Sequence, residues 1–593
     1  MFLFFVVAIL QTSFPLLLDA TFSTRLALLS LTIFVYSVYL LIEEKGIRIK
    51  ISLAHFLLLS FVILIGISAF WATSISLAFS ELFRAILFIS ILFIACYNLQ
   101  KDKFNTQVIL IKAIELCFLF SFITFLYQCA QISNYSYESI VQVSGISGHK
   151  NLYSSLTFLT AIASFIGVKV FKGRWRSISL ILFILQLLVI GFLRSRGVIV
   201  GMVVFSLCYL ILLGCKNLKV SKRGVKLIGV FFVLVLSLFF FKVFPTIISN
   251  TILGETKNFE IEKISDFGTL NERVLVWDKT YKLIYEKPVL GVGAGNWKLH
   301  YTKLGVPDIY KVTDLNVIFQ SPHNEYLKVL SELGILGFAI FLSFIVFVLL
   351  RLLFCLNESP LAPILFCGFM GFGTICFFSF PMGRVEHLTI LALLFALALS
   401  FSKKDARQIK IRSKSIFALI AMLFLVITVA SLFKVKSELY LTLMRKAYYQ
   451  GNQLEVIRYA DVSENIFTET DEFGVPISWY RANANVSSGN LSKADIDFKK
   501  ALKISPYNYH VLNDLGSSCF LNGEIDKAEI LYRKAIEINY RYDEPKFNLI
   551  VLLISQNRYI EALKMEDKLD KASDRRKELI KQIDKGLTKF QIK

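Results

Sequence analysis

Two arginines and one histidine in this sequence have the residue types that group transfer from a diphosphate requires. Arg196 opens an apolar run, while Arg273 and His323 lie in a polar segment that runs from residue 245 to 332. Guanidinium groups neutralise a leaving pyrophosphate, and an imidazole can take the proton from an attacking hydroxyl. Structural roles are the alternatives: a buried histidine at 323, and arginines at 194 and 196 that snorkel to a membrane interface.

The glycines at 291–295 and the spacing of the histidines show which cofactors the sequence does not predict. Gly291, Gly293 and Gly295 lack the next glycine of a dinucleotide fingerprint, because Asn296 holds that place. We expect a tight backbone turn near a ligand or another helix, which makes Gly293 and Gly295 candidate binding residues. The histidines show no metal-ligand spacing, so the sequence predicts neither a metal nor another cofactor; they are His55, His149, His300, His323, His387 and His510.

The elements that would hold these residues are membrane helices. Mean hydropathy is +0.61 and 55% of the residues are hydrophobic, with apolar runs long enough to cross a bilayer. The first run lacks the basic start and cleavage site of a signal peptide, so we expect it to be a span. We predict about thirteen spans, near residues 2–18, 24–42, 52–71, 78–98, 108–130, 151–171, 177–193, 197–215, 225–244, 333–356, 361–380, 386–401 and 415–433.

Lysine and arginine concentrate in alternate short loops, and this sets the predicted sidedness. By the positive-inside rule the cytoplasmic loops are those at 45–50, 101–103, 172–176, 216–226, 351 and 403–414. The N-terminus is then cytoplasmic, and the polar segment and the C-terminal part face outward. The net charge of +21 is mostly this topology signal, so we expect membrane lipids and no nucleic acid as partners.

The polar segment at 245–332 has about 85 residues, far more than an ordinary connection, and such loops are more often functional. Ser321 and Pro322 have the types expected at a helix N-cap and first turn, which would place His323 in that turn. His323 would then share a helix face with Tyr326. Because a helix N-terminus disfavours the imidazolium, we expect His323 to be neutral and able to accept a proton.

Arg84 lies inside an apolar run of the predicted fourth span. A charge deep in a membrane helix costs roughly 2.5 to 3.5 kcal/mol on insertion scales, so it usually faces the bundle interior and has a partner. Arg84 could pair with Glu81, one turn away, or belong to the substrate site. For Arg194 and Arg196 anion binding and snorkelling both remain open.

A repeat of 34 residues occupies the C-terminal part of the chain. Gly489, Ala494, Phe498, Ala501 and Pro506 recur one period later as Gly523, Ala528, Tyr532, Ala535 and Tyr540. The spacing resembles the tetratricopeptide repeat, in which small residues let paired helices approach closely and a proline ends the second helix. We predict an α-solenoid over residues 434–593, whose concave face could bind a protein partner.

With these motifs the chain resembles the bacterial O-antigen ligase and O-antigen polymerase family, which includes the protein O-oligosaccharyltransferases. The resemblance covers roughly residues 1 to 400. It rests on Gly148 to Asn151, on Ser195 to Gly197, on Arg273 with Trp277, on Pro288 with the three glycines, and on His323, Asn324, Tyr326 and Leu327 with Glu332, Leu333, Gly334 and Gly337.

The resemblance implies an all-α, GT-C-like membrane enzyme that moves a glycan from undecaprenyl diphosphate onto a hydroxyl, with inversion and without a metal. On that pattern Arg196 and Arg273 bind the diphosphate and His323 is the base. Further substrate-binding candidates are Asn324, Arg194, Arg84, Asn151, Gly293, Gly295 and Tyr326. The family commonly has about twelve spans, so a thirteenth that exports the repeats is a departure and leaves the acceptor open.

Three enzymatic outcomes follow: ligation onto a lipid A core in lipopolysaccharide biosynthesis, polymerisation of repeat units, or transfer to a protein hydroxyl. Ligase-like transfer ranks first because residues 291–337 fit it, and protein O-glycosylation stays close behind because helical repeats bind peptides. A transporter of lipid-linked sugars and a membrane-tethered scaffold are non-enzymatic alternatives. The predicted parts, in the bacterial inner membrane, are 1–244, 245–332, 333–433 and 434–593.

Overall fold

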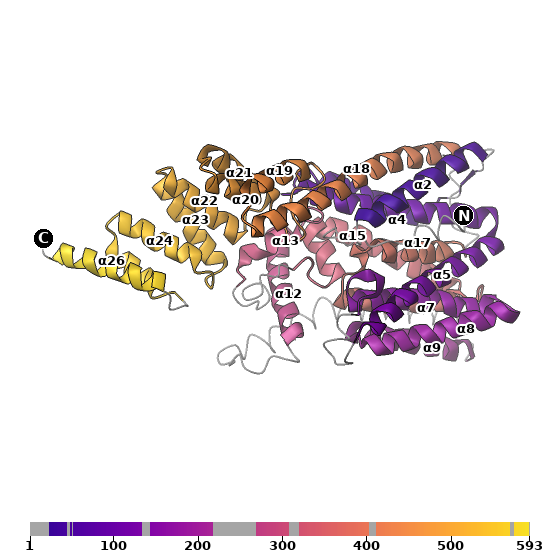
Figure 1. Cartoon of the computed structure of the whole chain (residues 1–593). Helices are drawn as coiled ribbons and strands as arrows, with labels where there is room; N and C mark the ends of the chain where they lie inside the picture. Colours follow the sequence, from indigo (N-terminus) through magenta and orange to yellow (C-terminus); the bar gives the residue numbers. More distant parts are fainter. Residues whose placement is uncertain are drawn as a thin grey trace.

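The computed structural model describes residues 23–43, 48–49, 51–132, 143–217, 268–306, 319–401, 411–569 and 574–591. Within this part the chain is almost entirely helical. Long apolar helices form a bundle, short paired helices form a solenoid toward the C-terminus, and α12 (Gly268–Glu286) and α13 (Trp297–His300) lie between the two (Figure 1). The prediction of an all-α membrane bundle followed by an α-solenoid is confirmed.

Eight described helices are long and apolar enough to cross a membrane: α2 (Ser23–Glu43), α4 (Ile75–Lys101), α5 (Lys103–Ala130), α7 (Lys150–Val170), α8 (Gly173–Leu193), α9 (Arg196–Asn217), α15 (Glu325–Phe354) and α18 (Ser413–Tyr449). Three shorter apolar helices accompany them: α3 (Leu53–Ser68), α16 (Ala362–Phe378) and α17 (Val385–Leu399). Each of these helices overlaps a predicted span, and α15 and α18 extend well beyond theirs. The predicted spans at 2–18 and 225–244 fall outside the described residues, so the count of about thirteen stays a prediction.

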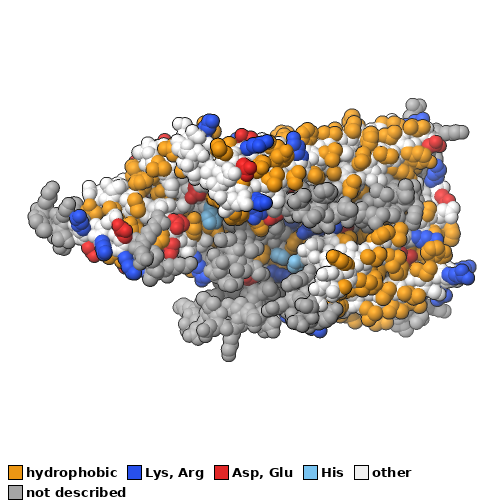
Figure 2. Space-filling model, in the orientation of Figure 1, with side chains coloured by type: hydrophobic (Ala, Val, Ile, Leu, Met, Phe, Trp, Pro, Cys, Tyr) orange, Lys and Arg blue, Asp and Glu red, His pale blue; other side chains and the backbone are white. Residues whose placement is uncertain are grey.

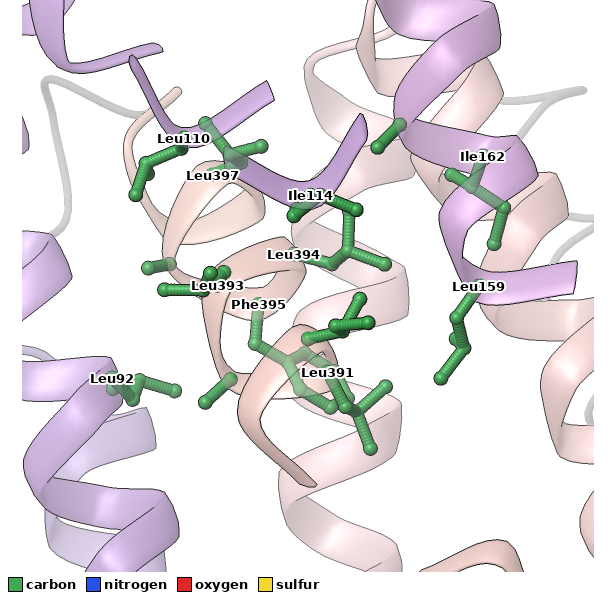
Figure 3. Packing of buried hydrophobic residues seen from close by; sticks show 14 of the residues in the cluster. Leu92, Leu110, Ile114, Leu159, Ile162, Leu391, Leu393, Leu394, Phe395 and Leu397 are labelled. Atoms are coloured by element: carbon green, nitrogen blue, oxygen red, sulfur yellow. The ribbon is translucent and has the colours of Figure 1, made fainter. Parts of the chain in front are cut away.

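The core of the bundle surrounds α17, in which every residue is buried. Figure 3 shows leucines and Phe395 of α17 packed against apolar side chains of α4, α5 and α7; the labelled partners are Leu92, Leu110, Ile114, Leu159 and Ile162. Such a helix is apolar on all sides because all of its sides face protein. On the described part of the bundle's visible face most side chains are hydrophobic, while charged ones gather on the solenoid and at the opposite end of the bundle (Figure 2).

The predicted turn between the seventh and eighth spans is confirmed. Arg194 ends α8 in the left-handed conformation, with φ of 50°, and α9 begins two residues later at Arg196. Two membrane helices therefore replace one apolar run that is too long for a single crossing.

Helix α15 is longer than the apolar run that predicted it and is interrupted at Gly334, where φ is 62°. A turn at residues 288–293 enters this interruption. The amides of Val292 and Gly293 donate to the carbonyl oxygens of Ser331 and Glu332 at 3.0 and 2.9 Å, and the amide of Ile335 donates to Pro288 at 2.8 Å. The freed backbone groups of the helix are thus satisfied by protein, as membrane depth requires.

The ends of the helices form two separate groups. At one end β1 (Arg48–Ile49) pairs with β2 (Ile411–Arg412), Lys103 Nζ donates to the Ser400 carbonyl at 3.1 Å, and an Arg351 nitrogen donates to the Leu399 carbonyl at 2.8 Å. Arg48, Lys103, Arg351 and Arg412 come from loops predicted to be cytoplasmic. At the other end the turn between α3 and α4 meets the segment that contains α13: the Asn296 side chain accepts from the Ser74 amide at 2.7 Å.

Helix α18 lies against α2 and continues past residue 434 without a break. The solenoid follows as α19 (Gln453–Ser463), α20 (Ile477–Ser487), α21 (Leu491–Ile504), α22 (Tyr509–Leu521), α23 (Ile525–Ile538), α24 (Glu544–Ser555), α25 (Tyr559–Glu566) and α26 (Asp574–Gln591). The small and aromatic residues of the predicted repeat are buried between paired helices: Ala494, Phe498, Ala501, Ala528, Tyr532 and Ala535. Pro506 lies just beyond the end of α21.

The solenoid packs directly on the segment that holds the candidate site. Val276 and Leu283 of α12 share one apolar cluster with Leu512 of α22 and Ile538 of α23. The Val306 amide also donates to the Ile538 carbonyl at 2.9 Å. The repeats are therefore held against α12 and α13 rather than hanging from α18 alone. The four-part division of the chain, whose boundary at 244 lies outside the described residues, stays a prediction.

Candidate functional site

Arg196 and Arg273 lie close enough to influence each other electrostatically. Arg196 is exposed at the start of α9, and Arg273 is partly buried near the start of α12. Burial lowers the pKa of Arg273, and the positive charge of Arg196 lowers it further. Two guanidinium groups near each other, one of them partly buried, favour an anion between them.

His323 lies before α15, in a position fixed from two directions. Its φ of 55° is left-handed, a conformation that costs a non-glycine residue about 1 to 2 kcal/mol. The indole N–H of Trp277, one turn after Arg273 on α12, donates to the carbonyl of Pro322 at 2.6 Å. The imidazole packs edge-on against Phe319 and Phe380, with centroid distances of 5.8 and 4.9 Å.

The prediction that Ser321 and Pro322 begin a helix with His323 in its first turn is wrong. Asn324 is the N-cap: its side-chain oxygen accepts from the amides of Tyr326 and Leu327 at 3.0 and 3.1 Å, and α15 begins at Glu325. Asparagine caps helices as well as serine does, and the left-handed backbone at His323 prevents a helix from starting earlier. His323 therefore precedes the helix and shares no helical face with Tyr326.

One short stretch of chain brings the three candidate catalytic residues into the same neighbourhood. Residues 377–380 comprise the last two residues of α16 and the two that follow it. A Cβ on Gly197, next to Arg196, would lie 3.1 Å from the Cβ of Phe378. The ring centroids of Phe377 and Trp277 lie 5.5 Å apart, and the Phe380 ring packs against the His323 ring. The start of α9, the first half of α12 and the residues before α15 thus meet around this stretch.

The other candidate residues divide into those near this stretch and those elsewhere. Arg194 is exposed, two residues before Arg196. Asn324 is almost fully buried as the helix cap, and the Tyr326 hydroxyl donates to the Gly373 carbonyl of α16 at 2.8 Å. Asn151 lies in the first turn of α7, which contacts the turn η5 (Pro381–Gly383).

Gly293 and Gly295 are packed against protein, in the tight turn that the sequence predicted. A Cβ on Gly293 would lie 2.8 Å from Ala72, and one on Gly295 would lie 2.8 Å from the carbonyl oxygen of Leu77. Both φ angles are positive. Because neither glycine has a side chain, the turn packs closely against Ala72 and the first residues of α4. Gly293 and Gly295 can therefore affect a binding site only by positioning the segment that contains them.

Arg84 belongs to a different group of charges. Its guanidinium pairs with Glu81 at 2.8 Å, as one of the two interpretations predicted, and Lys328 of α15 pairs with the same Glu81 oxygen at 2.7 Å. Arg84, Glu81 and Lys328 line a cavity whose walls include neither Arg196, Arg273 nor His323.

Sequence reasoning did not identify the residues that hold the site together. A Glu325 oxygen accepts from the Met382 amide at 2.7 Å, which ties η5 to the start of α15 beside Phe380. Trp277 was noted only as part of a motif. Neither bond has a local sequence signal, because its partners are 57 and 45 residues apart.

Among the described residues no group of three histidine, cysteine or acidic side chains is arranged to hold a metal ion. The candidate catalytic groups around residues 377–380 are two guanidinium groups and one imidazole, and the Glu272 carboxylate lies close enough to Arg273 to raise its pKa. Such a set can bind an anion and accept a proton.

Comparisons with known families agree with this picture. Residues 181–342 match the family described as O-antigen ligase, and residues 509–542 match a tetratricopeptide repeat. Residues 181–342 are thus similar to an O-antigen ligase domain. The resemblance read from the sequence is confirmed for both parts, and the matched range of the ligase domain contains Arg196, Arg273 and His323. A comparison with curated proteins finds no match.

The ligase domain supports a multi-pass membrane glycosyltransferase of the O-antigen ligase or polymerase kind. Arg84 and Asn151 lie outside the matched range, whereas Arg194, Gly293, Gly295, Asn324 and Tyr326 lie within it. The match begins inside α8 and ends inside α15, so it includes all of α9 and α12 but none of α7, α16 or α17.

Proposed function

We propose that this protein transfers a glycan from undecaprenyl diphosphate to an acceptor hydroxyl at the outer face of the bacterial inner membrane, as an O-antigen ligase does. The observation that supports it best is the proximity of Arg196 and Arg273, beside the stretch 377–380 that also contacts His323. A diphosphate is the leaving group that such a cationic pair suits.

In the proposed reaction the acceptor oxygen forms a bond to the anomeric carbon of the glycan. The bond from that carbon to the diphosphate oxygen breaks, and its electron pair leaves with undecaprenyl diphosphate. His323 takes the proton of the acceptor hydroxyl, and Arg196 and Arg273 neutralise the charge that develops on the diphosphate. Attack from the face opposite the leaving group inverts the anomeric configuration. No metal enters the scheme.

The test uses purified full-length protein in lipid vesicles, a labelled glycan on undecaprenyl diphosphate, and acceptors of each class. His323→Asn is the informative variant because asparagine tolerates the left-handed backbone at this position but is no base. We expect a fall in kcat of about 10²- to 10⁴-fold for His323→Asn and about 10²- to 10³-fold for Arg273→Ala.

Arg541→Ala, an exposed arginine of the solenoid, is the matched control and should transfer at the normal rate. Normal transfer by His323→Asn, with normal protein levels, would contradict the proposal and favour a transporter or scaffold. Which acceptor is used distinguishes ligase from polymerase and from protein O-oligosaccharyltransferase.

A further inference from the structure

Four aromatic side chains from successive helices form a row on the solenoid. They are Tyr448 near the end of α18, Trp479 of α20, His510 of α22 and Tyr542 just before α24. Neighbouring ring centroids in this order lie 5.8, 6.4 and 4.8 Å apart, and no two neighbouring rings are stacked face to face. All four side chains remain partly exposed. The row is therefore part of the solenoid surface, on the side of the first helices of the repeats.

One carboxylate lies beside this aromatic row. Asp514 is one turn after His510 on α22, and its Oδ2 atom accepts from the Trp479 indole N–H at 2.8 Å and from the Asn483 side-chain amide at 3.4 Å. Its Oδ1 atom accepts from the Asn513 side chain at 2.9 Å. All three donors are neutral, and among the residues that the structure describes no lysine or arginine forms an ion pair with Asp514. The carboxylate is held in place, but its charge is not compensated.

The surroundings of Asp514 carry a net negative charge. Burial raises the pKa of Asp514, and the charge of Glu544 adds to this effect. Burial also raises the pKa of Tyr542, and the charges of Asp514 and Glu544 raise it further. Burial lowers the pKa of His510 to about 4, so its imidazole is uncharged at neutral pH. A positively charged ligand would offset the electrostatic cost of the carboxylate.

Aromatic rings and a carboxylate together favour an organic cation. The face of an aromatic ring attracts ammonium and guanidinium groups, most strongly for tryptophan and where water is excluded. A phosphate or an acidic segment would instead be repelled by Asp514 and Glu544. The net charge of the chain is +21, which by itself would attract acidic partners. Attraction of a cation is therefore a property of this cluster and not of the protein as a whole.

The cation that fits this position belongs to a protein segment rather than to a lipid. Tyr448 lies about 22 Å along α18 from residue 433, where the predicted span ends, and this distance places the row beyond the reach of lipid head groups. Asn483 and Asn513 lie beside the row, and side-chain amides can both donate to and accept from a peptide backbone.

We propose that Tyr448, Trp479 and Asp514 bind the lysine or arginine side chain of an extended segment of a partner protein. The neighbouring asparagine amides would hydrogen-bond the main chain of that segment. The inference is independent of the proposed glycan transfer.

The experiment uses the full-length protein in phosphatidylcholine nanodiscs and an array of immobilised nonapeptides. The peptides form sets that differ only in the central residue, which is lysine, arginine, norleucine or glutamate, in many uncharged sequence contexts. Asp514→Asn keeps the shape of the side chain but removes its charge. Asp526→Asn removes the same charge at an exposed position of α23, the second helix of the same repeat, and is the matched control. Thermal unfolding shows whether each variant is folded.

We expect the wild-type protein to bind lysine and arginine peptides at least about tenfold more strongly than norleucine peptides in the contexts that bind best, a comparison that needs no variant. Asp514→Asn should reduce this ratio to near one, and Asp526→Asn should leave it unchanged. A preference for glutamate, binding that ignores the central residue, or a lysine preference that survives in folded Asp514→Asn would overturn the inference. Stronger binding of a soluble glucosamine tetramer than of any peptide would also overturn it, by assigning the site to an amino sugar.

Failure of this inference is distinguishable from failure of the proposed function. Asp514→Asn should transfer the labelled glycan at the normal rate, and His323→Asn should keep the preference for lysine peptides. Loss of transfer in His323→Asn with an unchanged peptide preference is the result expected if both are right. Absence of any lysine preference removes the cation site and leaves the proposed reaction standing.

Discussion

Trp277→Phe tests how the site is held together. The substitution keeps an aromatic ring against Phe377 but removes the N–H that donates to the Pro322 carbonyl at 2.6 Å. Loss of a buried hydrogen bond that leaves its partner unsatisfied costs about 1 to 3 kcal/mol. This is comparable to the cost of the left-handed backbone at His323, so we expect the segment before α15 to relax away from α12.

If the full free energy of this lost hydrogen bond raises the activation barrier of transfer, kcat falls about 5- to 150-fold. The KM for the donor should change little, because Arg196 and Arg273 keep their places. The assay is steady-state transfer of a labelled glycan in vesicles, with thermal unfolding measured in parallel.

Trp297→Phe is the matched control for this prediction. The Trp297 indole N–H donates to Thr280 at 3.0 Å, and both partners are buried in the same segment of the chain. It should lower the unfolding temperature about as much as Trp277→Phe does, yet leave kcat near normal. Equal losses of kcat in the two variants, or an unchanged kcat in Trp277→Phe, would refute the reasoning.

Three further predictions follow from the structure. Gly334→Ala should lower the free energy of unfolding by more than about 2 kcal/mol, because its φ is positive and the new Cβ would clash with the Val289 carbonyl. Gly489 also has a positive φ but faces open space, so Gly489→Ala should cost only about 1 kcal/mol in the same unfolding assay. Burial lowers the pKa of His300 and His510 to about 4, so between pH 6.5 and 4 the folded chain binds fewer protons than the unfolded one. The temperature of the unfolding midpoint should therefore fall as the pH drops from 6.5 to 4 and stay constant just above pH 6.5. The fall should be less steep in His300→Gln. A cysteine at exposed Ser488 should react with a membrane-impermeant maleimide in intact spheroplasts, and protection there would reverse the proposed orientation.

The fold was largely predictable because a helix that crosses a bilayer needs an apolar run of a fixed minimum length. Apolar runs of the necessary length mark the spans, and the arginines at 194 and 196 mark the turn between α8 and α9. The start of α15 was not predictable from hydropathy, since its first turns carry Glu325, Lys328 and Glu332. The apolar run begins near the interruption at Gly334, which is where the span was predicted to start.

The sequence names candidate site residues, but it does not predict how they are arranged. Ser321 and Asn324 are equally good N-caps by type, and the left-handed backbone of His323 that leaves Asn324 as the cap is not encoded in any local pattern. The pairing of Lys328 with Glu81 joins residues 247 positions apart. The packing of the repeats against α12 and α13 is likewise a tertiary contact. The sequence of neither part indicates that it packs against the other.

The central claim is that Arg196 and Arg273 bind one diphosphate beside His323. Its most direct test is the dissociation constant of the labelled undecaprenyl-diphosphate glycan for the wild type, Arg196→Ala, Arg273→Ala and the double variant. The account predicts non-additive losses, with a coupling of at least about 0.5 kcal/mol, and near-normal affinity in His323→Asn. Strictly additive losses, or unchanged affinity in either arginine variant, would contradict it.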